Sequence, residues 1–202
     1  MDKSYWDNIY RNKSEKEVSW FQETPTTSLN LIAELGLEST DGIIDIGGGD
    51  ARLVDHLLAK GFKNISLLDI SPTALDKSRA RLNENLEFVK FIVSDITKFD
   101  PHEKYKLWHD RATFHFLTSA EDISTYLEIA NRAIAPGGYL IVSTFSKTGP
   151  GKCSGLPVVR YSDADLKSLF EKYFSNIKCL EDTHKTPWDT DQKFVYCGFK
   201  KL

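Results

Sequence analysis

The sequence predicts an α/β fold in which a mostly parallel sheet is covered by helices on both faces. Apolar, strand-like runs alternate with helical patterns from residue 43 onward, as expected of a parallel sheet. The last two runs have no helical pattern between them, so they are expected to form an antiparallel pair at one edge. The runs cover residues 43–46, 65–69, 88–94, 106–109, 138–145, 176–180 and 193–199.

The first two helices between these strands have clear boundary signals. Leucine and valine recur at helical spacing over 53–58, and Gly61 can close that helix. Ser71 and Pro72 suit the cap and the first turn of the next helix. Both helices are therefore expected to follow their strands directly.

Two later helices begin at sequences that resemble capping boxes. Thr118 is followed by Glu121, and Ser162 is followed by Asp165. The helix after Thr118 should end at the Pro-Gly-Gly sequence of residues 136–138, which turns into the fifth strand.

The chain length and composition indicate one soluble domain. The 202 residues are 41% hydrophobic and 27% charged, and no apolar run approaches the roughly 20 residues of a membrane span. The formal net charge of -3 gives no electrostatic footprint for nucleic acid. We expect a helical, aromatic-rich lid segment over 1–40 and the sheet domain over 41–202.

The cysteines and histidines predict neither a disulfide framework nor a metal site. Cys153, Cys179 and Cys197 are few and far apart, and the five histidines show no ligand spacing. A reducing cytoplasm is therefore the expected location.

A glycine-rich turn follows the first strand and predicts a ligand site. Asp45 precedes Gly47, Gly48 and Gly49, and a helix follows. Glycines allow a sharp bend and a close approach of a ligand to the backbone. An acidic residue before the turn would repel a phosphate, so it favours a ligand with a cationic group.

Four successive strands end in an acidic residue, and these ends should meet at one edge of the sheet. The residues are Asp45, Asp69, Asp95 and Asp110. Asp69 lies 24 residues after Asp45, where an acid can accept hydrogen bonds from ribose hydroxyls. Asp95 could accept from an exocyclic amine such as that of adenine. The neighbouring Ile70 and Ile96 could enclose the base, so the predicted ligand is an adenosine without phosphate.

This pattern resembles the class I S-adenosylmethionine-dependent methyltransferases from about residue 42 to 145. Asp45-x-Gly47-x-Gly49-x-Ala51 matches the glycine motif of that family, and Asp69 and Asp95 match its ribose-binding and adenine-binding acids. Asp110 sits where the family places a residue facing the methionine end. The resemblance implies a Rossmann-like, doubly wound sheet of order 3-2-1-4-5-7-6, with S-adenosylmethionine as cofactor and S-adenosylhomocysteine as product.

The alternatives to methyl transfer are an oxidoreductase and a non-catalytic subunit. An NAD-dependent oxidoreductase would need Gly-x-Gly-x-x-Gly, but the third position counted from Gly47 is Arg52. A cofactor-binding, non-catalytic partner subunit stays open. The acceptor is expected to be a small molecule or a protein side chain, and the chain a monomer or a homodimer.

The segment 108–116 after the fourth strand is expected to line the acceptor site. His115 is the best-placed candidate base, with a structural histidine as the alternative. Asp110 is expected to bind the cofactor or cap a turn rather than to take a proton. Arg111 could hold an acidic substrate group, hold the methionine carboxylate, or form a structural ion pair. Trp20 could lie over the sulfonium of the cofactor or simply pack against the sheet.

Overall fold

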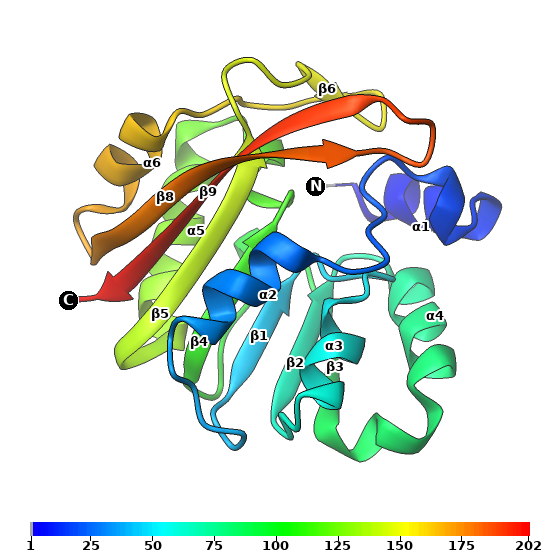
Figure 1. Ribbon diagram of the computed structural model, residues 1–202, viewed down its shortest axis with the longest axis horizontal. Helices are drawn as coiled ribbons and strands as arrows, with labels where there is room; N and C mark the ends of the chain where they lie inside the picture. The colour runs from blue at the N-terminus through cyan, green and yellow to red at the C-terminus, as the bar shows by residue number, and fades with distance from the viewer. Residues whose placement is uncertain (1) are drawn as a thin grey trace.

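A computed structural model describes residues 2–202 of the chain, so Met1 of the predicted lid segment lies outside the described residues. A seven-stranded sheet of order β3-β2-β1-β4-β5-β9-β8 forms its centre (Figure 1). The strands are β1 (Ile43–Ile46), β2 (Ile65–Asp69), β3 (Val89–Val93), β4 (Tyr105–Arg111), β5 (Ile134–Phe145), β8 (Phe174–Lys185) and β9 (Asp191–Lys201). Two short strands, β6 (Lys152–Cys153) and β7 (Leu156–Pro157), pair separately.

The predicted topology is confirmed. Strands β1 to β5 pair in parallel, whereas β9 is antiparallel to both β5 and β8. Counting the seven long strands in chain order gives 3-2-1-4-5-7-6, the order implied by the family resemblance.

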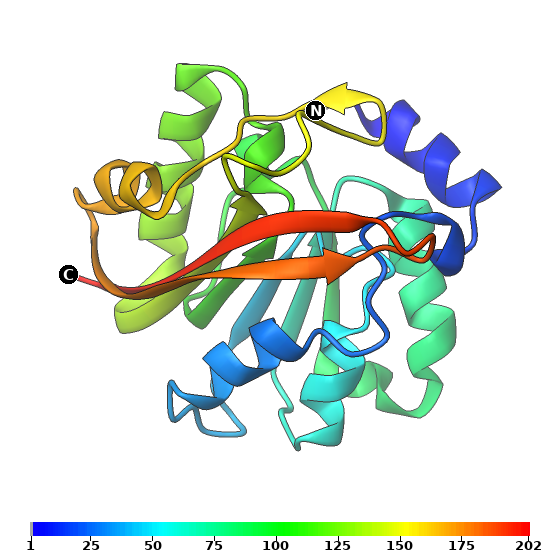
Figure 2. The same ribbon diagram turned by 45° about the horizontal axis from the view of Figure 1, so that its top comes forward.

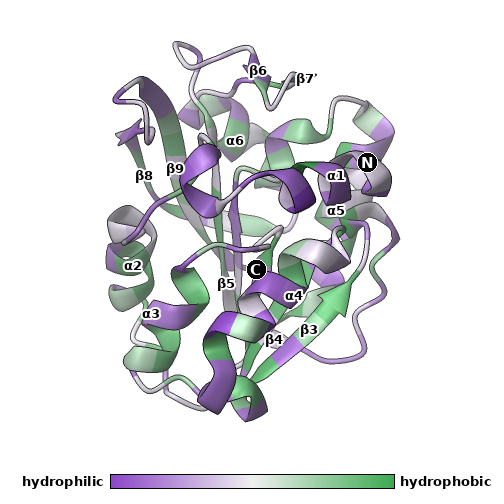
Figure 3. Cartoon of the chain, turned by 90° about the vertical axis from the view of Figure 1, so that its right-hand side faces the viewer, coloured by the Kyte–Doolittle hydropathy of each residue, from purple (hydrophilic) through white to green (hydrophobic). Residues whose placement is uncertain are grey.

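Helices cover both faces of the sheet. They are α1 (Lys3–Asn12), α2 (Thr26–Ala33), α3 (Leu53–Ala59), α4 (Pro72–Leu82), α5 (Ala120–Ala133) and α6 (Asp163–Phe170), with short 3₁₀ turns η1 (Glu15–Glu17), η2 (Asn83–Phe88), η3 (Ile96–Lys98) and η4 (Phe114–Phe116). Buried side chains of α2, α3 and α4 form one core cluster with the sheet, and those of α5 and α6 form another. Figure 3 shows the hydrophilic and hydrophobic bands that alternate along α3 and α4.

The pleat of the central strands sends successive side chains into these two clusters. Ile43 of β1 packs in the α2/α3/α4 cluster, whereas Ile44 packs in the α5/α6 cluster. The same alternation holds for Leu107 and Trp108 of β4. Burial on both faces explains why β1 is apolar except for Asp45.

Several element boundaries differ from the sequence expectation: β4, β8 and β9 are longer than predicted, and β5 and α5 begin elsewhere. Strand β5 begins at Ile134, so the Pro-Gly-Gly sequence lies inside the strand, next to an irregular register between β4 and β5. Helix α5 is capped by Ser119, whose hydroxyl accepts from the Asp122 N–H at 3.1 Å, one residue later than the predicted Thr118. The capping box of Ser162 and Asp165 is present as predicted.

The structure contains one disulfide that the cysteine spacing did not predict. Cys179 and Cys197 lie directly opposite each other on β8 and β9, and their sulfur atoms form a disulfide. Sequence spacing could not indicate it, because only the register of the hairpin brings the two residues together. None of the helices within residues 2–202 combines the length and apolar character that a membrane crossing requires.

The N-terminal segment and the β8–β9 hairpin meet beyond the carboxyl ends of the parallel strands. The hairpin extends past the sheet toward the N-terminal segment (Figure 2), and His184 of β8 forms a 2.7 Å hydrogen bond with the Ser19 carbonyl. Tyr5 of α1 donates a hydrogen bond to the carbonyl of Ser154 between β6 and β7. Helix α1, the β6–β7 hairpin and the β8–β9 hairpin thus surround the strand ends where the predicted site lies.

Candidate active site

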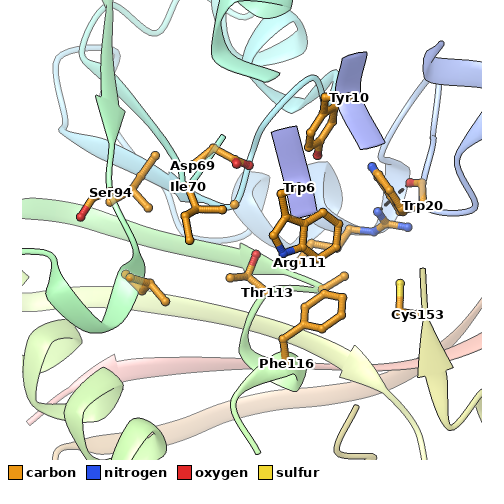
Figure 4. A pocket seen from close by; sticks show the side chains of 14 residues that line it. Trp6, Tyr10, Trp20, Asp69, Ile70, Ser94, Arg111, Thr113, Phe116 and Cys153 are labelled. Atoms are coloured by element: carbon orange, nitrogen blue, oxygen red, sulfur yellow. Dashed lines mark hydrogen bonds between the residues drawn. The ribbon is translucent and has the colours of Figure 1, made fainter. Parts of the chain in front are cut away.

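Two adjoining pockets lie at the carboxyl ends of β1, β2 and β4. The first encloses about 580 Å³ and is lined by Asp69, Ile70, Ile96 and aromatic side chains, as Figure 4 shows in part. The second encloses about 710 Å³ and is lined by Asp45, Gly48 and the residues after them. Tyr10, Trp20, Gly47 and Arg111 line both pockets. The two pockets are therefore adjacent, and each has a volume in the range of small-molecule sites.

The glycine turn has the shape of a cradle that only glycine permits. Gly47 has φ +64°, and a Cβ atom there would lie 1.8 Å from the Thr113 hydroxyl. A Cβ atom on Gly48 would lie 2.6 Å from the Asp45 carboxylate. The turn therefore brings bare backbone to the wall of the site, as a close-fitting ligand requires.

Asp45 is held by a buried chain of hydrogen bonds. Its Oδ1 lies 2.7 Å from His109 Nδ1, and His109 Nε2 lies 2.9 Å from the Ser28 hydroxyl. The Nδ1–H of His109 donates to the carboxylate of Asp45, and Nε2 shares the second hydrogen bond with the Ser28 hydroxyl. All three residues are buried and line the second pocket. The arrangement fixes a negative charge beside the glycine turn.

Sequence reasoning gave no role to His109 and did not notice Ser28. Asp45 and His109 are partners in the register of β1 and β4, so their contact follows from strand alignment. Ser28 comes from α2, 81 residues away from His109 in the sequence. Alignment of the two strands therefore predicts the contact between Asp45 and His109, but nothing in the sequence predicts the contact between His109 and Ser28.

Asp69 is a buried carboxylate in the first pocket. It accepts a 2.8 Å hydrogen bond from the Ser71 N–H. Burial raises the pKa of Asp69 to about 7, and the nearby charge of Asp45 adds to the rise. A Cβ atom on Gly49 would lie 2.7 Å from the Tyr10 hydroxyl and 2.9 Å from Asp69 Oδ2, so these groups flank the turn together. A carboxylate here fits a ligand that donates hydroxyl hydrogen bonds.

The apolar part of the first pocket contains the predicted isoleucines but not Asp95. Ile70 and Ile96 line it together with Leu68 and Ser94. The Asp95 carboxylate caps η3 and accepts from the N–H and hydroxyl of Thr97 at 3.0 and 2.9 Å. Asp95 is thus next to Ile96 in the chain but does not line the pocket, whose lining at this end is apolar apart from Ser94.

Asp110 lies behind the site. Its carboxylate accepts from the N–H groups of Thr113 and Phe114 and from the Tyr126 hydroxyl, at 3.0, 3.2 and 2.8 Å. It is fully buried, and burial raises its pKa to about 6. Asp110 therefore shapes the loop after β4 and does not line either pocket.

The expectation that His115 faces the acceptor needs correction. His115 is fully buried between Phe116 and Phe145, and its Nδ1 accepts from the Phe145 N–H at 3.4 Å. Burial, with the charge of Arg111, lowers the pKa of His115 to about 3. Neither pocket is lined by it. The 3₁₀ turn η4 directs this side chain into the core, which the sequence could not indicate.

An aromatic wall closes the outer side of the site. Trp6, Tyr10 and Trp20 contact one another edge to face, with Trp6 to Trp20 and Tyr10 to Trp20 centroid distances of 6.0 and 6.1 Å. Trp6 also contacts Phe116 at 5.1 Å (Figure 4). Trp20, for which the sequence left open a contact with the sulfonium or packing against the sheet, lines both pockets.

The residues of the site fit an adenosyl sulfonium without phosphate. The buried acid Asp69 suits a diol, the apolar end suits a base, and the cradle beside Asp45 suits an ammonium group. Asp45 and Asp69 would both repel a phosphate.

Comparison with known proteins places this geometry in a family. A family profile described as "Methyltransferase domain" matches residues 37–195. The chain is 29% identical over 145 residues to malonyl-[acyl-carrier protein] O-methyltransferase 2 of Ilyobacter polytropus, covering 69% of this chain and 54% of that protein. It is 25% identical over 130 residues to an eEF1A lysine and N-terminal methyltransferase homolog of Drosophila melanogaster, covering 63% and 19%. The chain thus spans about half, or less, of these relatives.

Solved structures share the fold. The N-methyltransferase NodS of Bradyrhizobium japonicum, in complex with S-adenosylhomocysteine, superposes with a TM-score of 0.74 at 14% identity, covering 99% of both chains. A Burkholderia thailandensis 1,6-didemethyltoxoflavin-N1-methyltransferase, also with S-adenosylhomocysteine, gives 0.75 at 17% identity, covering 99% of this chain and 87% of that one. The chain belongs to the methyltransferase domain family, and its recognition as a class I S-adenosylmethionine-dependent methyltransferase is confirmed.

Proposed function

We propose that this chain methylates a small-molecule acceptor enclosed between the two pockets, with S-adenosylmethionine as methyl donor. The observation that supports this most is the joined site, in which an acid-flanked glycine cradle and an apolar nucleoside pocket share the wall formed by Tyr10, Trp20, Gly47 and Arg111. The names of the relatives describe acceptors that range from a malonyl-carrier conjugate to eEF1A lysine. The closed aromatic wall favours a small acceptor over a protein side chain.

Each part of the cofactor has a natural partner in the site. We assign the ribose to Asp69, the base to the surface of Ile70 and Ile96, and the amino-acid end to Gly47–Gly49 and Asp45. For Asp95 and Asp110, expected from the sequence to bind the cofactor, we propose supporting roles: Asp95 holds the turn that carries Ile96, and Asp110 holds the loop after β4. When bound, the cofactor supplies a methyl group already activated on a sulfonium.

The chain has three tasks in this chemistry. It orients the acceptor in line with the methyl group, it excludes water, and it balances charge around the sulfonium. Trp6, Tyr10 and Trp20 exclude water because they are largely buried and cover the outer side. The acceptor must approach from the side of Phe116 and Cys153, which the cofactor assignment leaves unused. His115 is not included in the proposal as a base, because it does not reach this space.

The finer expectations from the sequence are part of the same proposal. We propose the 1–40 segment as the cover of the site, a cytoplasmic location, and a monomer or homodimer with no nucleic-acid partner. The formal net charge of -3 supports the last point. The Cys179–Cys197 disulfide weighs against a reducing location. The location is tested by isolating the protein from its own cells under alkylating conditions and counting its free thiols.

A thermal-shift experiment tests the cofactor assignment. S-adenosylmethionine and S-adenosylhomocysteine should each raise the melting temperature, since a ligand at 100 times its Kd adds about 2.7 kcal/mol. NAD should have no effect, and stabilisation by NAD alone would instead favour an oxidoreductase. Transfer of a radiolabelled methyl group from S-adenosylmethionine in a native extract, followed by size separation, should label a small molecule. Binding without any transfer would favour the non-catalytic partner subunit.

A further inference from the structure

The guanidinium of Arg111 lies where the two pockets join. Arg111 is the last residue of β4, and its side chain lines both pockets. Figure 4 shows it beside Trp20 and behind Trp6, on the side of the site that also holds Cys153. If the cofactor spans the pockets as proposed above, this junction is where its sulfonium would lie. The following argument rests on that proposed function.

All protein partners of this guanidinium are neutral. Nε donates to the Tyr196 hydroxyl at 3.1 Å, and Nη1 donates to the Trp20 carbonyl at 3.0 Å. The guanidinium also lies 5.1 Å from the centre of the Phe194 ring. Nη2 is buried and, among residues 2–202, makes no hydrogen bond. One edge of the guanidinium is thus anchored, and Nη2 is left with its donors unused.

No carboxylate of the described chain pairs with Arg111, although acids are close by in the second pocket. Asp45 is engaged with His109, Asp50 with Arg81, and Glu15 with Arg52. Cys153 supplies no negative charge either, because burial raises the pKa of its thiol to about 11. The structural ion pair considered from the sequence is therefore absent within residues 2–202, and Arg111 is a partly buried cation without a counter-ion.

A partly buried cation without a counter-ion has an unfavourable desolvation energy, and a second cation next to it adds electrostatic repulsion. A bound sulfonium would be that second cation. An anion placed between the two charges removes both penalties, and a carboxylate suits the guanidinium best because it can accept two hydrogen bonds at once. An ammonium acceptor such as a lysine side chain would instead meet two positive charges.

We propose that Arg111 binds a carboxylate of the methyl acceptor, so that the substrate is a small carboxylic acid. The carboxylate of the cofactor is the other possible source of this chemistry. The second pocket, however, offers that end of the cofactor the side chains of Lys13 and Lys77, whereas Arg52, which also lines it, is paired with Glu15. Arg111 lines the second pocket too, but it also faces the part of the first pocket formed by Phe116 and Cys153, which the cofactor assignment does not use.

Binding measurements on the product complex test this proposal without any turnover. The protein, saturated with S-adenosylhomocysteine, is screened by thermal shift and calorimetry against aromatic and aliphatic carboxylic acids, each paired with its primary amide. Benzoate with benzamide and phenylacetate with phenylacetamide are the first pairs. Acids should bind and their amides should not. Arg111→Gln should weaken acid binding at least tenfold, whereas Arg132→Gln, an exposed arginine on α5, should leave it unchanged.

The same variants separate the two sources of carboxylate. Arg111→Gln should bind S-adenosylhomocysteine within about twofold of the wild type. A tenfold loss for S-adenosylhomocysteine, with unchanged binding of 5′-methylthioadenosine, would assign Arg111 to the cofactor and overturn the proposal while preserving the proposed function. Equal binding of acids and amides, or no acid binding at all, would also overturn it. If Arg111→Gln fails to fold, Arg111→Lys should bind acids more weakly than the wild type but still prefer them over their amides. Loss of that preference would overturn the proposal. Failure of the wild type to bind S-adenosylhomocysteine would instead refute the proposed function.

Discussion

Replacing Asp69 by asparagine should make the cofactor-free protein more stable at alkaline pH and a weaker binder of its cofactor. Asp69 is 5% exposed, so its ionised form loses most of its hydration on folding. The Ser71 N–H donates a 2.8 Å hydrogen bond to its carboxylate, and the charge of Asp45 repels its ionised form. An asparagine can keep the bond from Ser71 and carries no charge.

The sign follows from the raised pKa. Between the ordinary pKa of 3.8 and the folded value of about 7, the folded protein holds a proton on Asp69 that the unfolded chain has released. Stability of the wild type therefore falls as pH rises through this window, by an upper limit of about 4 kcal/mol. The asparagine variant lacks this loss. Relative to the wild type, it should gain about 2–3 kcal/mol between pH 5 and pH 8.

Urea unfolding at pH 5 and pH 8, without cofactor, measures this gain. Asp100→Asn is the matched control, because the Asp100 side chain is 69% exposed and its variant should follow the wild type at both pH values. Calorimetry should show that Asp69→Asn weakens S-adenosylhomocysteine binding by about 1–3 kcal/mol, as expected for losing a charged acceptor. A stability difference between Asp69→Asn and wild type that is the same at both pH values would refute the reasoning.

Two further substitutions test the cradle and the buried chain behind it. Gly47→Ala should cost roughly 3–5 kcal/mol, because it adds a steric clash with Thr113 to the strain of φ +64°. Gly36→Ala, at φ +62° with open space around it, should cost only about 1–2 kcal/mol in the same urea experiment, and equal costs would argue against the clash. His109→Leu should weaken S-adenosylhomocysteine binding about tenfold while leaving 5′-methylthioadenosine unaffected, because Asp45 loses the hydrogen bond that holds its carboxylate beside the glycine turn, where the ammonium group is assigned. His109→Asn, which can still donate to Asp45, should restore part of the affinity; parallel losses for both ligands would show a merely structural role.

Local signals in the sequence were sufficient for the architecture. The strand β1, the glycine turn and the Ser162–Asp165 capping box each depend on neighbouring residues, and each was predicted from them. Boundaries that depend on tertiary contacts were not. Strand β5 continues back to Ile134 because its first residues pair with Tyr105 of β4, although proline and glycine argue for a turn there. The disulfide between β8 and β9 likewise depends on hairpin register.

In the candidate site, too, local signals predicted some residues and tertiary contacts decided others. Strand-end position correctly brought Asp45 and Asp69 to the pockets, because parallel strands end at a common edge. It could not say which way a side chain turns after the strand ends. Asp110 precedes Arg111 in β4 and His115 lies in the turn after it, yet both are fully buried and line neither pocket. The 3₁₀ turn η4 and the hydrogen bonds to Asp110 decide that outcome.

The contacts that give the site its charge pattern come from distant parts of the chain. Asp45 is paired with a histidine 64 residues away, and Arg111 is anchored on a carbonyl 91 residues away. The first pairing fixes a negative charge beside the glycine cradle, and the second fixes a positive charge at the junction of the pockets. A cofactor with an ammonium group and a sulfonium is complemented by the first charge and repelled by the second. A carboxylate brought by the acceptor, as proposed above, would balance the positive charge of Arg111 and separate it from the sulfonium.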